Sequence, residues 1–378
     1  MIEKKASTIM LISDYQAVAV STSKISENRL DVLRIGLFGE VGSLMATYKK
    51  LKREPGVISP DRRHEKIEEL GDIFWYLINI VDACDLKFHS LISELELLLD
   101  KEVYLLAGYK PTAPLLRAYG LDVNGDKFET LKVIGEKCSK ILTETPSTSL
   151  LTDFLFSLLQ LMASEGISLN EVLVMNEKKI SSRYSNSSIK DLPTFDQAFS
   201  DDERIPEVFE IVIKERGDGR TYMRMNNVVI GDPLSDNNKE DDGYRFHDVF
   251  HFSYAAILHW SPTFRSLIKH KRKSKKEIDE AEDGGRAGVI DEGVAAFVFS
   301  HAKLVNFFEG HDSVSTDLLK SIHRFVSGYE VAECPLWLWE RAILDGFAVF
   351  RQLRSARQGC IIGNRKNRTI EYRALGGE

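Results

Sequence analysis

Three acidic residues in the N-terminal half are spaced so that they could share one cation. Glu40 lies in "GEVGSLMATY", and Glu69 and Asp72 lie three apart in "EELGDIFWYL". Helical residues three apart project from one face. Carboxylates aimed at one point are costly unless protons or cations share them, and Mg²⁺ prefers such oxygen ligands together with water and phosphate. The pattern is typical of a Mg²⁺ site for a triphosphate; the alternative is that these are ordinary solvated acids.

A second group of metal-type ligands lies in the C-terminal half. In "YRFHDVFHFSYAAILHW", His247 and His251 are four apart, which is metal-ligand spacing on a helix. Further carboxylates and one arginine follow in "EAEDGGRAGVIDEGVAAFVFSHA". Two imidazoles with one or two carboxylates could hold a divalent metal beside an arginine that meets a phosphate. The alternative is a buried polar network between helices. The candidate residues of this second site are His247, Asp248, His251, Glu282, Arg286 and Glu292.

Helical periodicity accounts for most of the N-terminal half. Ser168 and Glu171 have the spacing of a capping box at the start of the last helix there. The polar stretch 181–207 contains two prolines and indicates a domain boundary. The predicted helices are 28–52, 64–84, 88–106, 128–145, 148–165 and 168–184.

Past this boundary the pattern changes. "FEIVIKERGDGRTYMRMNNVVIG" alternates around the turn "GDGR" and predicts a β-hairpin, and "CIIGNRKNRTIEYRAL" offers a second strand pair. Long helical stretches lie between them. We therefore expect a mainly α protein with two domains: a helical bundle over 1–190, and a mostly helical domain with a small antiparallel sheet over 205–378. The predicted C-terminal helices are 244–260, 262–272, 277–308, 316–330 and 336–357.

Composition limits the possible partners. A net charge of −7 argues against wholesale nucleic-acid binding, and the basic stretch 264–277 runs directly into the acidic "EIDEAED". The four cysteines form no C-x-x-C pair, which is typical of reduced residues in the cytosol. The sequence shows no signal peptide and no uncharged apolar run of membrane-spanning length. We expect a cytoplasmic protein that contacts no membrane.

The N-terminal half also contains an internal similarity. A shift of 81 residues places Asp72 on Asp153, and a shift of 96 places Glu40 on Glu136 and Ser43 on Ser139. The offsets differ because the loop between the helices would be 15 residues shorter in the second copy. Two copies, about 28–106 and 127–185, would pack as a pseudo-dimer of four main helices. The alternative is that any two amphipathic helices share such apolar spacing.

"GLFGEVGS…EELGDIFWYL" resembles the MazG-like all-α nucleoside triphosphate pyrophosphohydrolases. Their pattern is E-x-x-E on one helix and E-x-x-D on the next, coordinating Mg²⁺. Glu40 matches the first acid and Glu69 and Asp72 match the last pair, while Ser43 replaces the family's other Glu. The resemblance implies that Glu40, Glu69 and Asp72 are the catalytic metal ligands for Mg²⁺, with Mn²⁺ as a substitute.

Such domains also end in N-x-x-K-x-x-x-R-[FY], which contacts the nucleotide. "NEKKISSRY" supplies this motif in the second copy, whereas the first copy has Leu95 and Leu98 at the places of Asn and Lys. Conversely, the second copy has Leu150 at the place of Glu69. We therefore expect one composite site with acids from copy one and substrate contacts from copy two. These predicted substrate-binding residues are Asn176, Lys179, Arg183 and Tyr184.

The resemblance implies hydrolysis of an NTP or dNTP to the monophosphate and pyrophosphate. The segment from 205 onward resembles the C-terminal domain attached to some MazG-like proteins, so by analogy a role in phage defence fits, with a homodimer or a defence-system protein as partner. Two other hypotheses stay open. The protein could be a nucleotide sensor that no longer cleaves, or its catalytic centre could be the cluster of His247, His251 and Glu292.

Overall fold

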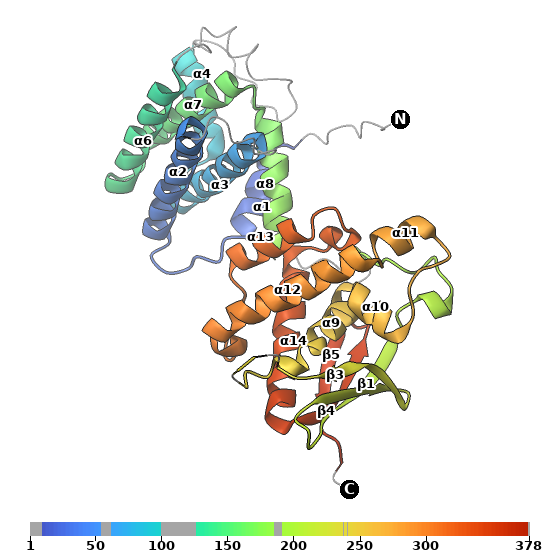
Figure 1. The fold of residues 1–378 in the computed structure, drawn as a ribbon. Helices are drawn as coiled ribbons and strands as arrows, with labels where there is room; N and C mark the ends of the chain where they lie inside the picture. Colours follow the sequence, from blue (N-terminus) through green and yellow to red (C-terminus); the bar gives the residue numbers. More distant parts are fainter. Residues whose placement is uncertain are drawn as a thin grey trace. The chain divides into compact units, whose positions relative to one another are not determined.

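The computed structural model describes residues 10–53, 62–99, 126–184, 191–236, 238–239 and 241–376. The chain divides into two compact units, 1–185 and 186–378, and each is considered by itself. The N-terminal unit is helical where it is described, and the C-terminal unit combines helices with one antiparallel sheet (Figure 1). The predicted mainly α fold class is confirmed.

The described N-terminal helices follow the predicted ranges closely. Local signals explain several ends: Ser147 accepts a hydrogen bond from the backbone N–H of Leu150, and Gly166 ends the same helix with φ of 63°. The predicted capping box forms, because the backbone N–H of Glu171 donates to Ser168 Oγ at 3.2 Å. The predicted helix over 88–106 is described only to Leu99. The helices are α1 (Ile12–Ser21), α2 (Arg29–Arg53), α3 (Arg62–Ala83), α4 (Phe88–Leu99), α6 (Lys127–Thr143), α7 (Thr148–Glu165) and α8 (Leu169–Tyr184).

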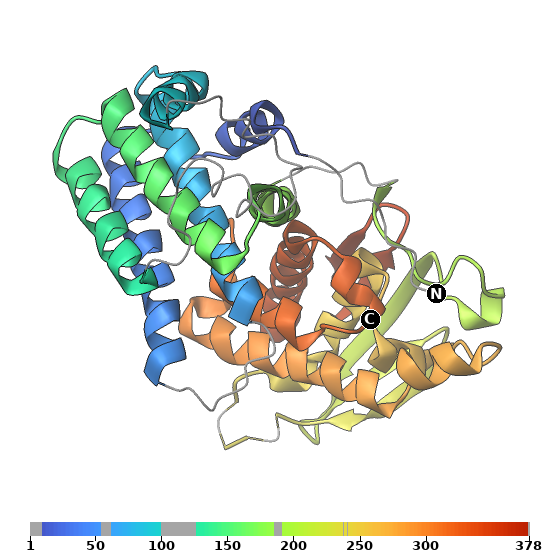
Figure 2. The ribbon, with the colours of Figure 1, turned by 90° about the horizontal axis from the view of Figure 1, so that it is seen from above.

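The four long helices α2, α3, α6 and α7 lie side by side as a bundle (Figure 2). α2 packs on α3 and α6 packs on α7, with α2 and α6 joining the two pairs. The helix that follows each pair in the chain packs on the other pair: α4, which follows α3, packs on α7, and α8, which follows α7, packs on α3. Fully buried Leu37, Leu77, Ile134 and Leu158 belong to the common core. The duplication stays a prediction, but this exchange is the packing that a pseudo-dimer would need to build a composite site.

The C-terminal unit contains one five-stranded antiparallel sheet with strand order β3-β2-β1-β4-β5. Both predicted hairpins form, and pairing of β1 with β4 joins them; Ile211 lies opposite Ile361. A third strand follows β2 through a turn at Asn226 and Asn227, which both have positive φ. The strands are β1 (Val208–Glu215), β2 (Thr221–Met225), β3 (Val228–Leu234), β4 (Gln358–Asn364) and β5 (Thr369–Arg373).

Several predicted C-terminal helices are wrong in extent: the helix predicted over 262–272 ends at Ile268, and the one over 316–330 ends at Phe325. The stretch 277–308 forms two helices, because the chain breaks at Gly284, where a Cβ would lie 2.2 Å from the carbonyl oxygen of Glu280. The stretch 244–260 also changes type, since α9 passes into a π-helix over Tyr254–Leu258. The helices of this unit are α9 (Asp248–Ser253), α10 (Pro262–Ile268), α11 (Lys276–Ala281), α12 (Gly285–Leu304), α13 (Thr316–Phe325) and α14 (Leu336–Ala356).

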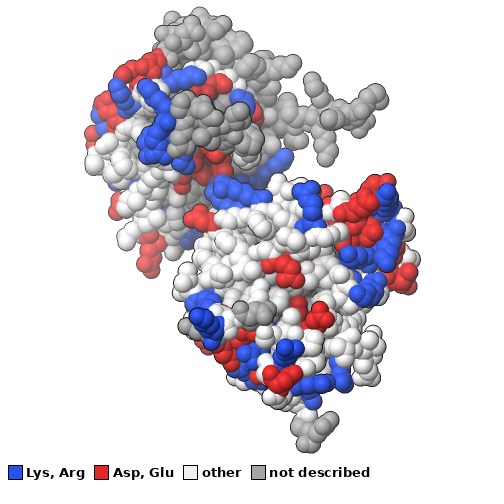
Figure 3. All heavy atoms as spheres, in the orientation of Figure 1, with Lys and Arg blue, Asp and Glu red and all other residues white. Residues whose placement is uncertain are grey.

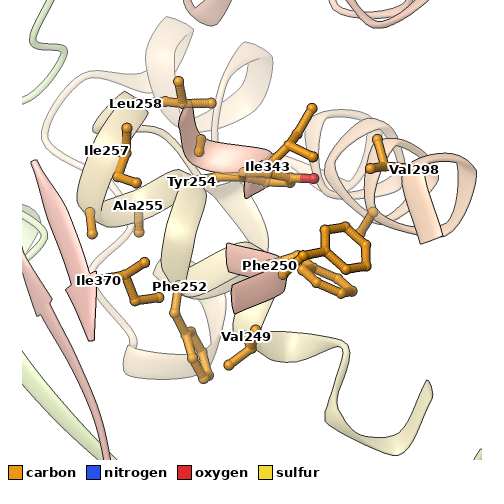
Figure 4. Close-up of a cluster of buried hydrophobic side chains, with 14 of the residues drawn as sticks. Val249, Phe250, Phe252, Tyr254, Ala255, Ile257, Leu258, Val298, Ile343 and Ile370 are labelled. Carbon is orange, nitrogen blue, oxygen red and sulfur yellow. The ribbon is translucent and has the colours of Figure 1, made fainter. Parts of the chain in front are cut away.

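The C-terminal core lies where α9, the π-helix, α12, α14 and the sheet meet. Phe250 and Tyr254 project between Val298 of α12 and Ile343 of α14, while Ile370 of β5 closes the opposite side (Figure 4). Burial of this apolar surface is the main source of stability for the unit. The histidines of α9 are therefore carried on a helix whose other face is anchored in the core.

Buried ion pairs attach part of the predicted boundary stretch to this core. Asp196 lies 2.7 Å from Arg265 and 2.6 Å from Arg365, measured between the carboxylate oxygens and guanidinium nitrogens. Arg272 binds Asp283 and Glu330. Asp196 lies before residue 205, where we predicted the domain to begin, so the C-terminal unit includes part of the stretch 181–207 in which we placed the boundary.

Among the described residues, no single helix has both the length and the apolar composition to cross a membrane. α7 and α8, joined by a 104° bend, meet these criteria as a pair by length and composition alone.

Candidate functional site

The predicted acidic residues of α2 and α3 come together in the structure. Glu40, Glu69 and Asp72 each place one carboxylate oxygen within 4.8 Å of the other two, and all three residues are half-buried. Glu40 comes from α2, while Glu69 and Asp72 lie on one face of α3. Three oxygen donors at this separation are an arrangement that one divalent cation can bridge.

Helix α8 places a lysine and an asparagine directly on this acidic group. Lys179 Nζ lies 2.7 Å from Asp72 Oδ1, also contacts Oδ2, and lies 3.1 Å from Glu68 Oε1. Asn176 Nδ2 donates to Asp72 Oδ1 at 3.0 Å. Burial lowers the pKa of Lys179, but Asp72 and Glu68 raise it more, so its net shift is upward and the ammonium is charged at neutral pH.

The close approach of α8 to α3 depends on Gly71. A Cβ at this position would lie 2.7 Å from the Cβ of Asn176. On its other side, Asn176 Oδ1 accepts a hydrogen bond of 2.7 Å from the hydroxyl of Tyr15, which is fully buried on α1. This bond directs the Asn176 amide nitrogen toward Asp72. Sequence reasoning missed Tyr15, because no motif surrounds it and α1 was not predicted.

The other predicted residues of this site lie on the same helices. Tyr184 is 41% exposed at the end of α8, with the Arg183 guanidinium 5.8 Å from its ring centre. Ser43, three residues after Glu40 on α2, is half-buried. Tyr76 lies beside the acids: burial raises its pKa, and Glu40 and Asp72 raise it further. Tyr184 is exposed and Arg183 is half-buried beside it, so a ligand in solution can reach the Tyr184 ring.

The corresponding positions of the second predicted copy carry no such cluster. Glu136 forms an exposed pair with Lys140 at 3.0 Å, which is an ordinary i, i+4 surface contact. Lys137 donates to the backbone carbonyl of Asp153 at 2.7 Å. Leu95 is fully buried and Leu150 packs against the core, while the side chain of Leu98 lies outside the described residues. These surroundings agree with the predicted complementary loss between the copies, which stays a prediction.

The histidine cluster of the C-terminal unit also forms. His247 Nε2 and His251 Nε2 lie 3.5 Å and 3.3 Å from the same oxygen, Glu292 Oε2, and His247 Nε2 lies 3.9 Å from Asp248 Oδ1. His247, Asp248 and His251 place ligand atoms within 4.8 Å of one another. Among the described residues there are two groups of this kind: this one, and the acids of α2 and α3.

Acceptors behind both rings fix their orientation. His247 Nδ1–H donates to the carbonyl of Tyr244 at 2.9 Å, and His251 Nδ1–H donates to Asp291 Oδ1 at 2.8 Å. Asp291 is held in turn by the Ser261 hydroxyl at 2.6 Å. Burial lowers the pKa of His251, but Asp291 and Glu292 raise it more, so its net shift is upward. Ser261 was missed as a site residue, although the N-cap pattern of "SPTF" marks it as the start of a helix.

Two predicted members of the second site have other surroundings. Glu282 accepts a hydrogen bond of 3.1 Å from the backbone N–H of Glu330, and Arg286 is exposed on the first turn of α12. In the basic stretch 264–277, Arg272 is buried against Asp283. Acidic and basic side chains lie intermixed over α11 (Figure 3), where Lys276 pairs with Glu280 at 3.7 Å. This surface shows the charge balance that we expected.

Comparison with known proteins places the C-terminal unit in a family. Residues 190–376 match the family model of the MazG C-terminal domain. This part of the chain therefore belongs to that family, and the relationship indicates a nucleotide-related role for the protein. The match does not extend over the N-terminal unit, so its MazG-like character stays a prediction.

Three characterised relatives match over shorter segments. Elongation factor 4 of Chlorobium phaeovibrioides is 32% identical over 109 residues, which is 28% of this chain and 18% of that protein. Elongation factor 4 of Chlorobium luteolum is 31% identical over 109 residues, again 28% of this chain and 18% of that protein. Gene 37 protein of Mycobacterium phage L5 is 35% identical over 57 residues, 15% of this chain and 50% of that protein. No solved structure matches. The chain thus spans at most half the length of these relatives.

Proposed function

We propose that the protein is a divalent-metal-dependent nucleoside triphosphate pyrophosphohydrolase whose site lies on α2, α3 and α8. The observation that carries this proposal is the convergence of Glu40, Glu69 and Asp72 with Lys179 of α8. Acids to hold a cation and a lysine to meet phosphate are the groups that hydrolysis of a phosphoanhydride requires. The residues come from both predicted copies, as a composite site demands.

The donor set fits Mg²⁺, and Mn²⁺ as a substitute, because all three candidate ligands are carboxylates. Glu40, Glu69 and Asp72 would hold the ion. When bound, it would neutralise the triphosphate and favour attack of water on phosphorus. Ser43 leaves this set one carboxylate short of the four acids in the family pattern. Fewer acidic ligands mean weaker metal binding, which the nucleotide phosphates would have to complete.

The chain's own residues have separable roles in this proposal. Lys179 and Arg183 bind phosphate oxygens, and Glu69 orients the attacking water. Asn176, fixed by Tyr15, holds Asp72 in place. Water adds to the α-phosphorus, the bond to the bridging oxygen breaks, and the monophosphate and pyrophosphate leave. Tyr184, exposed at the end of α8, is available to the base or sugar.

The test is a product assay on the eight common NTPs and dNTPs with Mg²⁺ and then Mn²⁺. We expect monophosphate and pyrophosphate from the wild type and from His247→Ala, and loss of both products in Glu69→Gln. Glu136→Gln is the control for loss of a single acid, because Glu136 is an exposed acid at the position of the second copy that matches Glu40. Turnover that survives Glu69→Gln but vanishes in His247→Ala would move the catalytic centre to the C-terminal unit.

Ser43 and the direct contact between Lys179 and Asp72 favour a second candidate, a nucleotide sensor without turnover. In that case one nucleotide would raise the melting temperature of the wild type, with no product formed by any variant. A role in phage defence, with a defence-system partner or a second copy of the chain, is a further part of our proposal that rests on analogy. Infection of cells that carry wild type or Glu69→Gln would test it.

A further inference from the structure

The histidine cluster of the C-terminal unit has a geometry that the proposed function does not use. Two imidazole nitrogens, His247 Nε2 and His251 Nε2, approach a single oxygen, Glu292 Oε2, at 3.5 Å and 3.3 Å. His247 immediately precedes α9, His251 lies on α9, and the glutamate lies on α12. Asp248 adds a second carboxylate, 3.9 Å from His247 Nε2. Glu292 therefore approaches both histidines, and Asp248 belongs with the same histidines to a group whose ligand atoms lie within 4.8 Å of one another.

Both rings are held in the orientation that a metal ligand needs. A hydrogen bond from each Nδ1–H, to the Tyr244 carbonyl in one case and to Asp291 in the other, directs Nε2 of each ring into the cluster. Asp291 itself receives hydrogen bonds from the Ser261 hydroxyl and the backbone N–H of Thr263, at 2.6 Å and 3.1 Å. Outer carboxylates and carbonyls of this kind are the usual support of metal-binding histidines.

The second nitrogen of His251 is poorly satisfied. His251 is fully buried, and its Nε2 has an ion-pair contact of 3.3 Å with Glu292 Oε2 that lacks the geometry of a hydrogen bond. A buried polar nitrogen that is poorly paired costs free energy. A cation bound between His251 Nε2 and Glu292 would satisfy both groups.

We propose that the C-terminal unit binds one divalent transition metal ion through His247, His251 and Glu292, with Asp248 as a further ligand. Imidazole nitrogen suits Zn²⁺, Co²⁺ and related ions, whereas Mg²⁺ prefers oxygen. The protein would then carry two metal sites of different chemistry, one all-oxygen and one mixed nitrogen and oxygen. This second site is independent of whether the N-terminal site hydrolyses nucleotides.

The exposure of the ligands gives the metal a way in. Glu292 is 46% exposed, while the side chains of His247 and His251 are 11% and 0% exposed. The histidines thus form the closed side of the site and the glutamate its solvent side. The helices that carry them are anchored by the apolar core around Phe250 and Val298. We therefore expect the metal-free unit to stay folded, in contrast to small domains that need zinc to fold.

The experiment uses the full-length chain stripped with a chelator and titrated with ZnCl₂ by calorimetry, and with CoCl₂ by visible absorption. We expect one Zn²⁺ per chain that excess MgCl₂ does not displace, and cobalt absorption bands typical of low coordination number with nitrogen ligands. Glu292→Gln and His247→Gln should each weaken Zn²⁺ binding by at least about tenfold. Elemental analysis after desalting gives an independent count.

Two matched controls should keep wild-type binding: His311→Gln, an exposed histidine, and Glu69→Gln, a ligand of the N-terminal site. Because Glu292 is half-exposed, Glu292→Gln should fold, and near-UV circular dichroism of each stripped variant checks this. Absence of Zn²⁺ binding in the wild type would overturn the proposal. So would equal binding by wild type, His247→Gln and Glu292→Gln, or a Zn²⁺ site that Glu69→Gln abolishes.

Discussion

The ammonium group of Lys179 contacts both carboxylate oxygens of Asp72. Lys179 belongs to α8 of the second predicted copy, and Asp72 to α3 of the first. A residue expected to bind phosphate therefore rests on a residue expected to bind metal. In the proposed reaction Lys179 has to leave Asp72 for the phosphate oxygens when the metal and nucleotide bind. Binding of the metal at Asp72 and binding of phosphate at Lys179 would therefore be coupled.

Lys179→Met should separate metal binding from nucleotide binding. The change removes a cation beside Asp72, so we expect Mg²⁺ to bind the nucleotide-free variant more tightly. It also removes a charge-assisted contact to phosphate, so KM for the nucleotide should rise roughly 10- to 100-fold. Calorimetric titration with Mg²⁺ and steady-state kinetics measure the two effects. Lys178→Met, at the exposed neighbouring position, is the control and should change neither quantity.

If Lys179→Met instead weakened both Mg²⁺ and nucleotide binding equally, the lysine would be holding α8 against α3. In that case our assignment of a phosphate contact would be wrong. Lys179→Arg keeps the charge but not the length, so it should retain part of the nucleotide affinity in the proposed role.

Gly71→Ala tests whether the distance between α3 and α8 matters for function. The added methyl group would lie 2.7 Å from Asn176 Cβ, which is attached directly to the α8 backbone and cannot rotate away. We expect the variant to lose about 1–3 kcal/mol of unfolding free energy and most of its turnover. Gly42→Ala on α2, where a Cβ meets nothing within 4 Å, should stabilise the helix by roughly 0.5–1 kcal/mol. Equal stability of the two variants would contradict the proposed tight contact.

Sequence periodicity predicted the helices that have strong apolar faces and clear caps. α7 begins at a serine cap and ends at a left-handed glycine, so both ends could be placed. α1 could not be predicted, because only Tyr15 and Ala19 of its ten residues are buried. Its position depends on a contact with α8, which is distant in the sequence. Likewise, the two hairpins were visible as local patterns, but pairing of β1 with β4 joins segments about 150 residues apart.

Site residues were predictable where several ligands lie on one helix. Glu69 with Asp72, and His247 with His251, follow from helical spacing, and the structure places each pair together. Glu282 was grouped with Glu292 because one continuous helix was assumed, whereas the chain breaks between them at Gly284. The direct contact of Lys179 with Asp72 could not be predicted, because it depends on how α8 of one copy crosses α3 of the other.

The pH dependence of stability in the C-terminal unit should contain a contribution from His259. Burial, with help from Arg365 and Arg368, lowers the pKa of His259 to about 3, against about 6.5 for an exposed histidine. Between these values the unfolded chain binds a proton that the folded chain does not. The unfolding free energy therefore falls as pH decreases through this window, by about 1.4 kcal/mol per pH unit.

His259→Asn should remove that component. Asparagine tolerates the φ of 61° at this position, so the change removes the imidazole without straining the backbone. Urea unfolding followed by fluorescence is weighted toward this unit, because three of the four tryptophans, Trp260, Trp337 and Trp339, lie in it. We expect a flatter pH profile for the variant between about pH 4 and pH 6. Identical slopes for wild type and variant would show that His259 does not titrate on unfolding.

The serine that replaces a family acid offers a gain-of-function test. Ser43 lies one turn after Glu40 on α2, so Ser43→Glu would place a fourth carboxylate on the same face. An added acidic ligand should raise Mg²⁺ affinity and shift the Mg²⁺ dependence of turnover to lower concentration, by roughly tenfold. Ser139→Glu makes the same change at the corresponding exposed position of α6, where Glu136 is paired with Lys140. We expect no effect on Mg²⁺ binding from this control, because α7 carries Leu150 at the place of the α3 glutamate. An equal gain in both variants would indicate general electrostatic attraction and not ligation. No gain from Ser43→Glu, with the fold intact, would contradict the placement of the metal beside Glu40.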